Sequence, residues 1–135
     1  MQAAPLDGRI RAVVALAPFA ELRQAAERAA PFWMGRHSIA AALERAEVEG
    51  HFRVDEVSPR RSAEQLHVPL LIVHGGEDRK LPPADAQAIY AAAPVRDKKL
   101  VLIDHANHEN LMDHKEAWTA IDQFLDRAPP LDGRR

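Results

Sequence analysis

The 135-residue chain is 47% hydrophobic and 28% charged, values typical of one globular domain and unlike those of a disordered chain. Its formal net charge of −2 and its pI near 6.4 argue against nucleic acid or an anionic membrane as a partner. The sequence has no cysteine, which excludes disulfides and thiolate chemistry and fits a reducing compartment, so we expect a cytoplasmic protein. The longest apolar run, residues 12–20, is too short to span a bilayer.

The amino-terminal part predicts one strand followed by a helical insertion. The strand is expected at about residues 11–17, because β-branched residues are dense there and a proline, which cannot donate to a ladder, follows. Residues 19–57 are expected to form a small cap-like insertion of two helices that covers one end of the sheet. The first helix should lie within residues 21–30, and the second should run from Ser38, as its N-cap, to Gly50.

A cluster of large apolar side chains, Phe32, Trp33 and Met34, joins these two helices. The cluster could line an apolar substrate pocket beneath the insertion. The simpler interpretation, which we prefer, is that it forms the core of the insertion. The apolar face expected on the second helix consists of Ile39, Ala42, Leu43 and Ala46.

The carboxyl-terminal part predicts two further strands, each followed by a helix. Residues 69–74 form a uniformly apolar run, which suits a strand buried on both faces of a parallel sheet, and a third strand is expected at 99–103. A helix should start at residues 81–83. Its expected buried stripe is Ala86, Ile89, Tyr90 and Ala93. Asp113, with Glu116 three residues later, predicts a capping box for the last helix. The buried face expected there is Ala117, Trp118, Ile121 and Leu125.

Strands alternate with helices along the chain, which predicts an α/β fold with three parallel strands. We expect a single domain over residues 1–127. Residues 128–135 show no periodicity and are expected to form a flexible tail.

Two polar side chains follow consecutive expected strands. Asp78 comes after the second strand and His108 after the third, so their loops should lie side by side at one edge of the sheet. An aspartate in that position can hold an imidazole in one tautomer and stabilise its protonated form. Each residue also has an ordinary explanation, Asp78 as a turn residue and His108 as a surface histidine. Their arrangement favours an acid and a base.

A nucleophile for this pair is missing from the sequence pattern. No glycine flanks a serine in the G-x-S-x-G elbow that accompanies such an acid and base. Ser38 is better explained as a helix cap, and Ser58 precedes a proline in a connection.

Two other site types can be weighed against the sequence. His74-Gly75-Gly76 imitates an esterase oxyanion motif, but that motif belongs to a loop far upstream of the acid. We therefore expect His74 to be buried at the strand end and bonded to backbone. His105 and His108, with Asp104, Asp113 and His114 nearby, suggest a metal site, but no close-packed ligand set emerges. We predict neither a metal nor a cofactor.

Several segments together resemble the carboxyl-terminal half of an α/β-hydrolase, most closely the branch with dienelactone hydrolase and prolyl oligopeptidase-type peptidases. They are the strand ending at Pro18, the run from Ser58-Pro59 to Pro69, the block Leu71–Asp78 followed by Leu81-Pro82, and Ala106-Asn107-His108-Glu109 before a final helix. The resemblance covers roughly residues 7–125.

The resemblance implies a serine hydrolase acting on esters, peptides or amides, with Asp78 as the acid and His108 as the base of a Ser-Asp-His triad. His108 is preferred over His105, which occupies a position where relatives often carry glycine. Relatives carry the nucleophile elbow and about five strands before the point where Met1 stands, and Met1–Ala4 resembles the last turn of the helix after the nucleophile. We therefore expect a truncated hydrolase that is inactive alone, or alternatively a non-catalytic remnant or small partner-binding α/β module.

The same resemblance implies an unpaired edge on the first strand. An exposed apolar edge is a template for pairing with another chain, so we expect self-association through residues 10–17.

Overall fold

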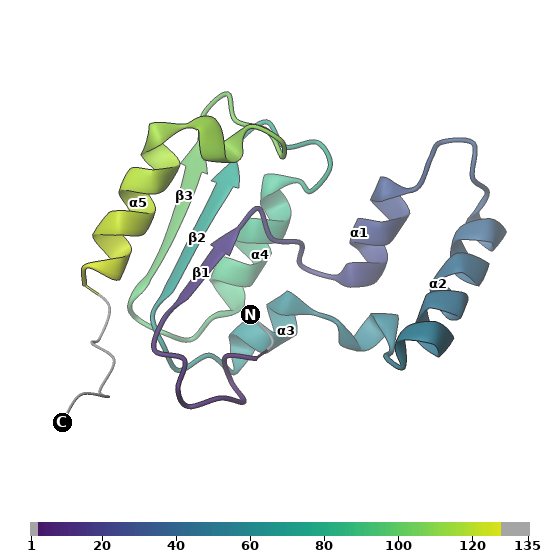
Figure 1. The fold of residues 1–135 in the computed structure, drawn as a ribbon, viewed down its shortest axis with the longest axis horizontal. Helices are drawn as coiled ribbons and strands as arrows, with labels where there is room; N and C mark the ends of the chain where they lie inside the picture. The colour runs from purple at the N-terminus through teal and green to yellow at the C-terminus, as the bar shows by residue number, and fades with distance from the viewer. Residues whose placement is uncertain (1–2, 128–135) are drawn as a thin grey trace.

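The computed structural model describes residues 3–127 and has three parallel strands in one open sheet, with helices on both faces (Figure 1). The strands are β1 (Val13–Leu16), β2 (Leu70–Gly75) and β3 (Lys98–Ile103), in the order β1-β2-β3. This confirms the predicted α/β fold with three parallel strands. The expected tail at 128–135 and the first two residues of the expected helical turn at the amino terminus lie outside the described residues. No helix within residues 3–127 is long and apolar enough to cross a membrane.

The central strand β2 organises both layers of the core. All six of its residues are buried, which agrees with the uniformly apolar sequence. Ile72 pairs with Ala15 on one side and with Leu100 on the other. Because side chains alternate across a strand, Leu70 and Ile72 enter one layer while Leu71 and Val73 enter the opposite one.

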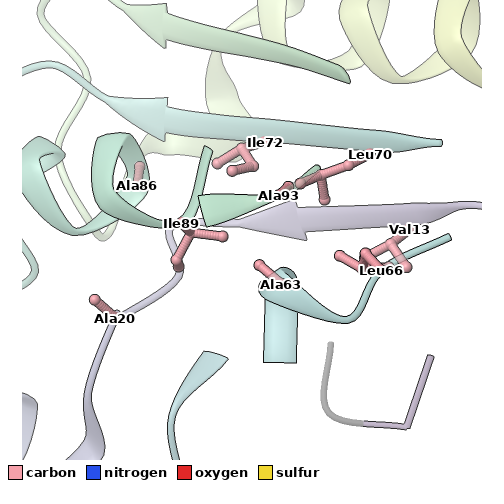
Figure 2. Close-up of a cluster of buried hydrophobic side chains, with 9 residues drawn as sticks. All are labelled: Val13, Ala20, Ala63, Leu66, Leu70, Ile72, Ala86, Ile89 and Ala93. Carbon is pink, nitrogen blue, oxygen red and sulfur yellow. The ribbon is translucent and has the colours of Figure 1, made fainter. Parts of the chain in front are cut away.

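One layer lies between the sheet and the helices α3 (Pro59–Glu64) and α4 (Pro83–Ala92). Figure 2 shows its side chains: Val13, Ala20, Ala63, Leu66, Leu70, Ile72, Ala86, Ile89 and Ala93. The stripe predicted for α4 is buried as expected, except that Tyr90 is only half-buried.

The opposite layer is covered by α5 (Lys115–Leu125), whose buried face differs from the prediction. Trp118 and Leu125 are each 52% exposed, and Ala120 and Phe124 are buried in their place beside Ala117 and Ile121. The predicted capping box is also wrong. The short turn η2 (Leu111–Asp113) precedes the helix, and His114 is the N-cap without a side-chain bond. The indole of Trp118 instead donates to the Met112 carbonyl (2.8 Å) at the surface.

Residues 22–56 form an arm to one side of the sheet (Figure 1). The arm contains α1 (Leu22–Ala29), α2 (Arg36–Gly50) and η1 (Val54–Glu56). Ser38 lies inside α2, whose N-cap is Gly35, so the predicted cap is wrong. The helix ends at Gly50, as predicted, and its C-cap residue His51 has a left-handed φ of 52°.

The aromatic residues of the arm are not in its core. Phe32 is fully exposed, and Trp33 is 71% exposed. No residue of α2 is buried. The core interpretation of this cluster is therefore wrong, because the arm leaves its two large aromatic side chains exposed.

A buried carboxylate on α4 holds the start of the arm. The Asp85 side chain is 7% exposed, and its Oδ2 accepts from Arg28 Nη1 of α1 (2.8 Å) and from the Ala20 backbone N–H (3.3 Å). A second ion pair joins Arg60 of α3 to Glu21 (3.0 Å). Because the first contact reaches a nearly dry carboxylate, it is the stronger of the two.

The carboxyl end of α4 is closed by a lysine from β3, and removing that amine should destabilise the fold. Lys98 Nζ donates to the carbonyls of Tyr90 (2.8 Å) and Ala93 (2.6 Å). It also lies 4.6 Å from the Tyr90 ring centroid. We expect Lys98→Met to lower the free energy of unfolding by about 1–3 kcal/mol, measured by urea denaturation. The control is Lys99→Met on the adjacent exposed residue, with an expected change within about 0.5 kcal/mol. Equal losses would contradict this role.

Candidate active site

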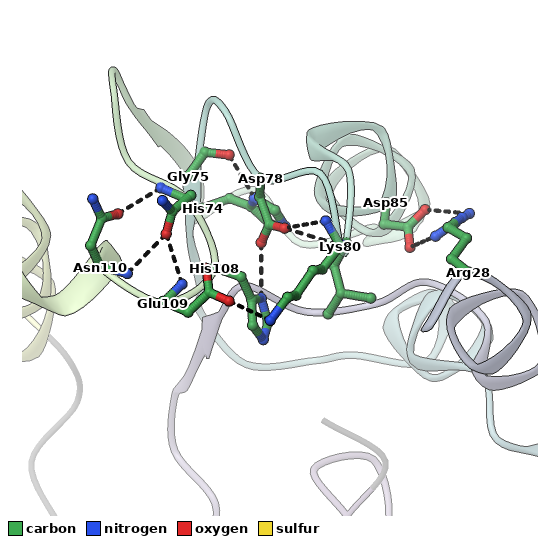
Figure 3. A network of polar contacts seen from close by, with 11 residues as sticks. Arg28, His74, Gly75, Asp78, Lys80, Asp85, His108, Glu109 and Asn110 are labelled. Carbon is green, nitrogen blue, oxygen red and sulfur yellow. Dashed lines mark hydrogen bonds and ion pairs between the residues drawn. The ribbon is translucent and has the colours of Figure 1, made fainter. Parts of the chain in front are cut away.

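The structure brings Asp78 and His108 together at the carboxyl edge of the sheet. Asp78 lies in the turn after β2, and His108 lies in the loop after β3, the neighbouring parallel strand. Asp78 Oδ2 is 2.9 Å from His108 Nδ1 (Figure 3). This distance is that of a direct hydrogen bond, so the two residues predicted from separate loops form one unit.

The carboxylate of Asp78 is buried and fully engaged. Its side chain is inaccessible, while that of His108 is 37% exposed. Asp78 Oδ1 accepts from the backbone N–H groups of Lys80 and Leu81, both at 2.9 Å. An ionised carboxylate can only accept, so the proton of the shared bond belongs to His108 Nδ1. The Nε2 atom of His108 then keeps its lone pair and can take a proton.

The pair lies in a shallow cleft of about 330 Å³, lined by residues 77–80 and 107–109. Charges at its rim are largely paired. Lys80 contacts Glu109, and this hydrogen bond lowers the pKa of the Glu109 carboxyl and raises the pKa of the Lys80 amine. Both side chains are exposed, so salt screens the attraction.

The other histidines of the region are placed differently. His105 is exposed, and its Nδ1 lies 2.9 Å from Glu77 Oε1, so it does not contact Asp78. Its φ of 61° is left-handed, which is the backbone conformation that favours glycine. His74 is fully buried, and its Nδ1 lies 3.0 Å from the Gly75 carbonyl, as expected for a histidine bonded to backbone.

An asparagine pair in the loop of His108 was missed by sequence reasoning. Asn110 Oδ1 accepts from the Asn107 backbone N–H (2.7 Å). Asn107 Oδ1 accepts from the N–H groups of Glu109 (2.9 Å) and Asn110 (3.1 Å). Asparagine side chains commonly close turns in this way, so the Asn-His-Glu-Asn spacing was the available signal. These three hydrogen bonds fix the turn that presents the imidazole.

Among residues 3–127, no hydroxyl group lines the cleft. Ser58 caps α3, Ser62 donates to the Ser58 carbonyl, and Ser38 lies within α2. The hydroxyl of Thr119 donates to a carbonyl of its own helix, α5. Within residues 3–127, no three histidine, aspartate or glutamate side chains form a group that could hold a metal. The arrangement therefore offers an oriented base without a nucleophile.

The family model described as serine aminopeptidase, S33, matches residues 57–115, which include both members of the pair. Among solved structures, the chain is similar to an acetyl xylan esterase from Paenibacillus sp. R4, with a TM-score of 0.67 and 22% identity over 94% of this chain and 40% of that chain. It is also similar to the esterase domain of a Rhodothermus marinus protein (TM-score 0.61, 16% identity, 94% of this chain and 55% of that one). A Pyrococcus horikoshii acylaminoacyl peptidase gives a TM-score of 0.64 at 13% identity, over 98% of this chain and 23% of that one.

These structures are α/β-hydrolases, and the chain has their fold. It spans little more than half the length of the Rhodothermus domain and less of the other two. At these identities the likeness concerns the fold alone.

Replacing the buried carboxylate by an amide should reverse the tautomer of His108. In Asp78→Asn, the amide N–H can donate to Nδ1, which forces the ring proton onto Nε2 and removes the lone pair that faces the cleft. We expect this reversal in the 15N shifts of the His108 ring. The control is Glu77→Gln, which removes a charge from the same turn but contacts His105. An unchanged His108 tautomer in Asp78→Asn would contradict the assignment of the shared proton.

Proposed function

We propose that Asp78 and His108 are the acid and the base of a serine hydrolase of the α/β-hydrolase type. The observation that carries this proposal is the 2.9 Å contact between the buried carboxylate and His108 Nδ1. The reaction class is ester or amide hydrolysis by acyl transfer to a serine. We place the chain near the dienelactone hydrolase and prolyl oligopeptidase branch, on the sequence blocks around the two residues.

In this proposal each residue has a separate part in the chemistry. His108 Nε2 takes the proton of the serine hydroxyl as the hydroxyl oxygen attacks the substrate carbonyl, and later gives the proton to the leaving group. Asp78 holds the ring with Nδ1–H toward itself and stabilises the imidazolium that forms. The serine must come from polypeptide other than residues 3–127, because no hydroxyl among them reaches the cleft.

A non-catalytic module that binds a partner is the second candidate, and the cleft without a hydroxyl favours it. The two candidates differ in what the pair does when a serine is supplied. A catalytic pair would activate that serine, whereas a binding module would leave it inert.

The test compares this chain alone with a protein that joins it to a G-x-S-x-G segment, either by extension or by complementation. We expect the chain alone to show no esterase or peptidase turnover and no labelling by a fluorophosphonate, because acid and base have no hydroxyl to activate. In the joined protein, we expect Asp78→Asn to lower kcat by about four orders of magnitude, as in a trypsin-like triad. His108→Ala should cost at least as much.

The matched control in the joined protein is His105→Ala, which removes an exposed imidazole from the same loop and should have a mild effect. Equal losses at both histidines would contradict His108 as the base. Stoichiometric labelling of one serine in the chain alone would show that its nucleophile has been overlooked.

We also propose that the chain self-associates through the open edge of β1. The strand has no charged residue, and Leu16 is 42% exposed. The opposite edge strand, β3, carries Lys98 and Lys99, and charges of this kind protect an edge from pairing.

The self-association proposal predicts a mass that rises with protein concentration in sedimentation. Leu16→Lys should shift the chain toward monomer by placing a charge on the open edge. The matched control is Leu102→Lys on β3, because Leu102 is 40% exposed. A wild-type chain that stays monomeric at high concentration would refute the proposal.

A further inference from the structure

The two glycines that close β2 differ in the space around them. A Cβ added to Gly75 would lie 2.5 Å from the Ala106 carbonyl oxygen, 2.8 Å from the Ala106 carbonyl carbon and 3.1 Å from the Asn107 nitrogen. A Cβ added to Gly76 would meet nothing closer than the Ile103 carbonyl oxygen at 3.3 Å. Neither glycine has a positive φ, so the requirement at Gly75 is one of space and not of backbone conformation.

The atoms that crowd Gly75 belong to a backbone that is held in place. The Ala106 carbonyl accepts from the Glu77 N–H (2.9 Å), and the Ile103 carbonyl accepts from the Gly76 N–H (2.8 Å). Ala106 is fully buried in the layer beneath α5. These bonds join the turn after β2 to the loop after β3, so neither segment can move alone.

The crowded contact lies close in sequence to both members of the pair. Ala106 precedes His108 by two residues, and Gly75 precedes Asp78 by three. The segments between them are short and hydrogen-bonded, so a displacement at Gly75 is passed to the two side chains. The distance between these backbones therefore sets the distance between the carboxylate and the imidazole.

We infer that Gly75 is a positioning residue, whose missing side chain lets the two loops approach until Asp78 and His108 form their hydrogen bond. An alanine at this position would push the loops apart by about half an ångström or more before its Cβ reached a tolerable contact. A bond of 2.9 Å would then stretch to the limit of a hydrogen bond or break. An effect of Gly75 on catalysis rests on the proposed function. Its effect on the hydrogen bond between Asp78 and His108 does not.

The test compares Gly75→Ala with Gly76→Ala in the full chain, with the His108 tautomer as the readout. Circular dichroism and a dispersed amide spectrum first establish that each variant is folded. We expect Gly75→Ala to lose the Nδ1–H preference, with ring 15N shifts moving toward the tautomer mixture of a histidine without a partner. Gly76→Ala should keep the wild-type shifts. A purely structural role for Gly75 would lower stability without changing the tautomer.

A folded Gly75→Ala chain with wild-type His108 shifts would overturn the inference. If Gly75→Ala alone does not fold, the same measurement is made on Gly75→Ala with Ala106→Gly, because deleting the buried methyl group gives the loop room to retreat. Loss of the tautomer preference there supports the inference. Retention of the preference, or failure of the double variant to fold, overturns it. Failure of Asp78→Asn to change the tautomer would count against the proposed function instead.

Discussion

Burial of β2 on both faces is the constraint on which the rest of the structure depends. Its apolar side chains pack against α3 and α4 on one face of the sheet and against α5 on the other. The strand therefore lies in the centre of the sheet, between β1 and β3. Once β2 and β3 are parallel neighbours, the residues that follow them emerge at the same edge. The pairing of Asp78 with His108 is thus a consequence of how the core is filled.

The features that could be predicted from sequence are those set by this burial. The apolar run before His74 determines a central strand, and the proximity of Asp78 and His108 follows from the neighbouring ends of β2 and β3. The helix α4 could be predicted for the same reason, since its Ala86 and Ile89 stripe faces the sheet. In these segments the local pattern and the tertiary environment agree.

The features that could not be predicted depend on contacts between distant segments. Trp118 is exposed because the short turn before α5 sets the helix start and offers the indole a carbonyl at the surface. Phe32 looked interior by hydrophobicity alone, yet the arm has no second layer to cover it. The close approach of Ala106 to Gly75 could not be predicted, because the sequence does not distinguish a glycine that is required for lack of space from one that is required for a turn.

The hydrogen bonds that join the loops of Asp78 and His108 have a consequence for the energetics of the proposed reaction. Everything that aligns the imidazole lies within one continuous stretch, from β2 to η2. In the proposed hydrolase, the imidazole is therefore preorganised before a hydroxyl group arrives, because the chain orders it on folding. Under that proposal, a serine supplied to this surface would only have to position its oxygen, and reorganisation of the imidazole would not add to the barrier.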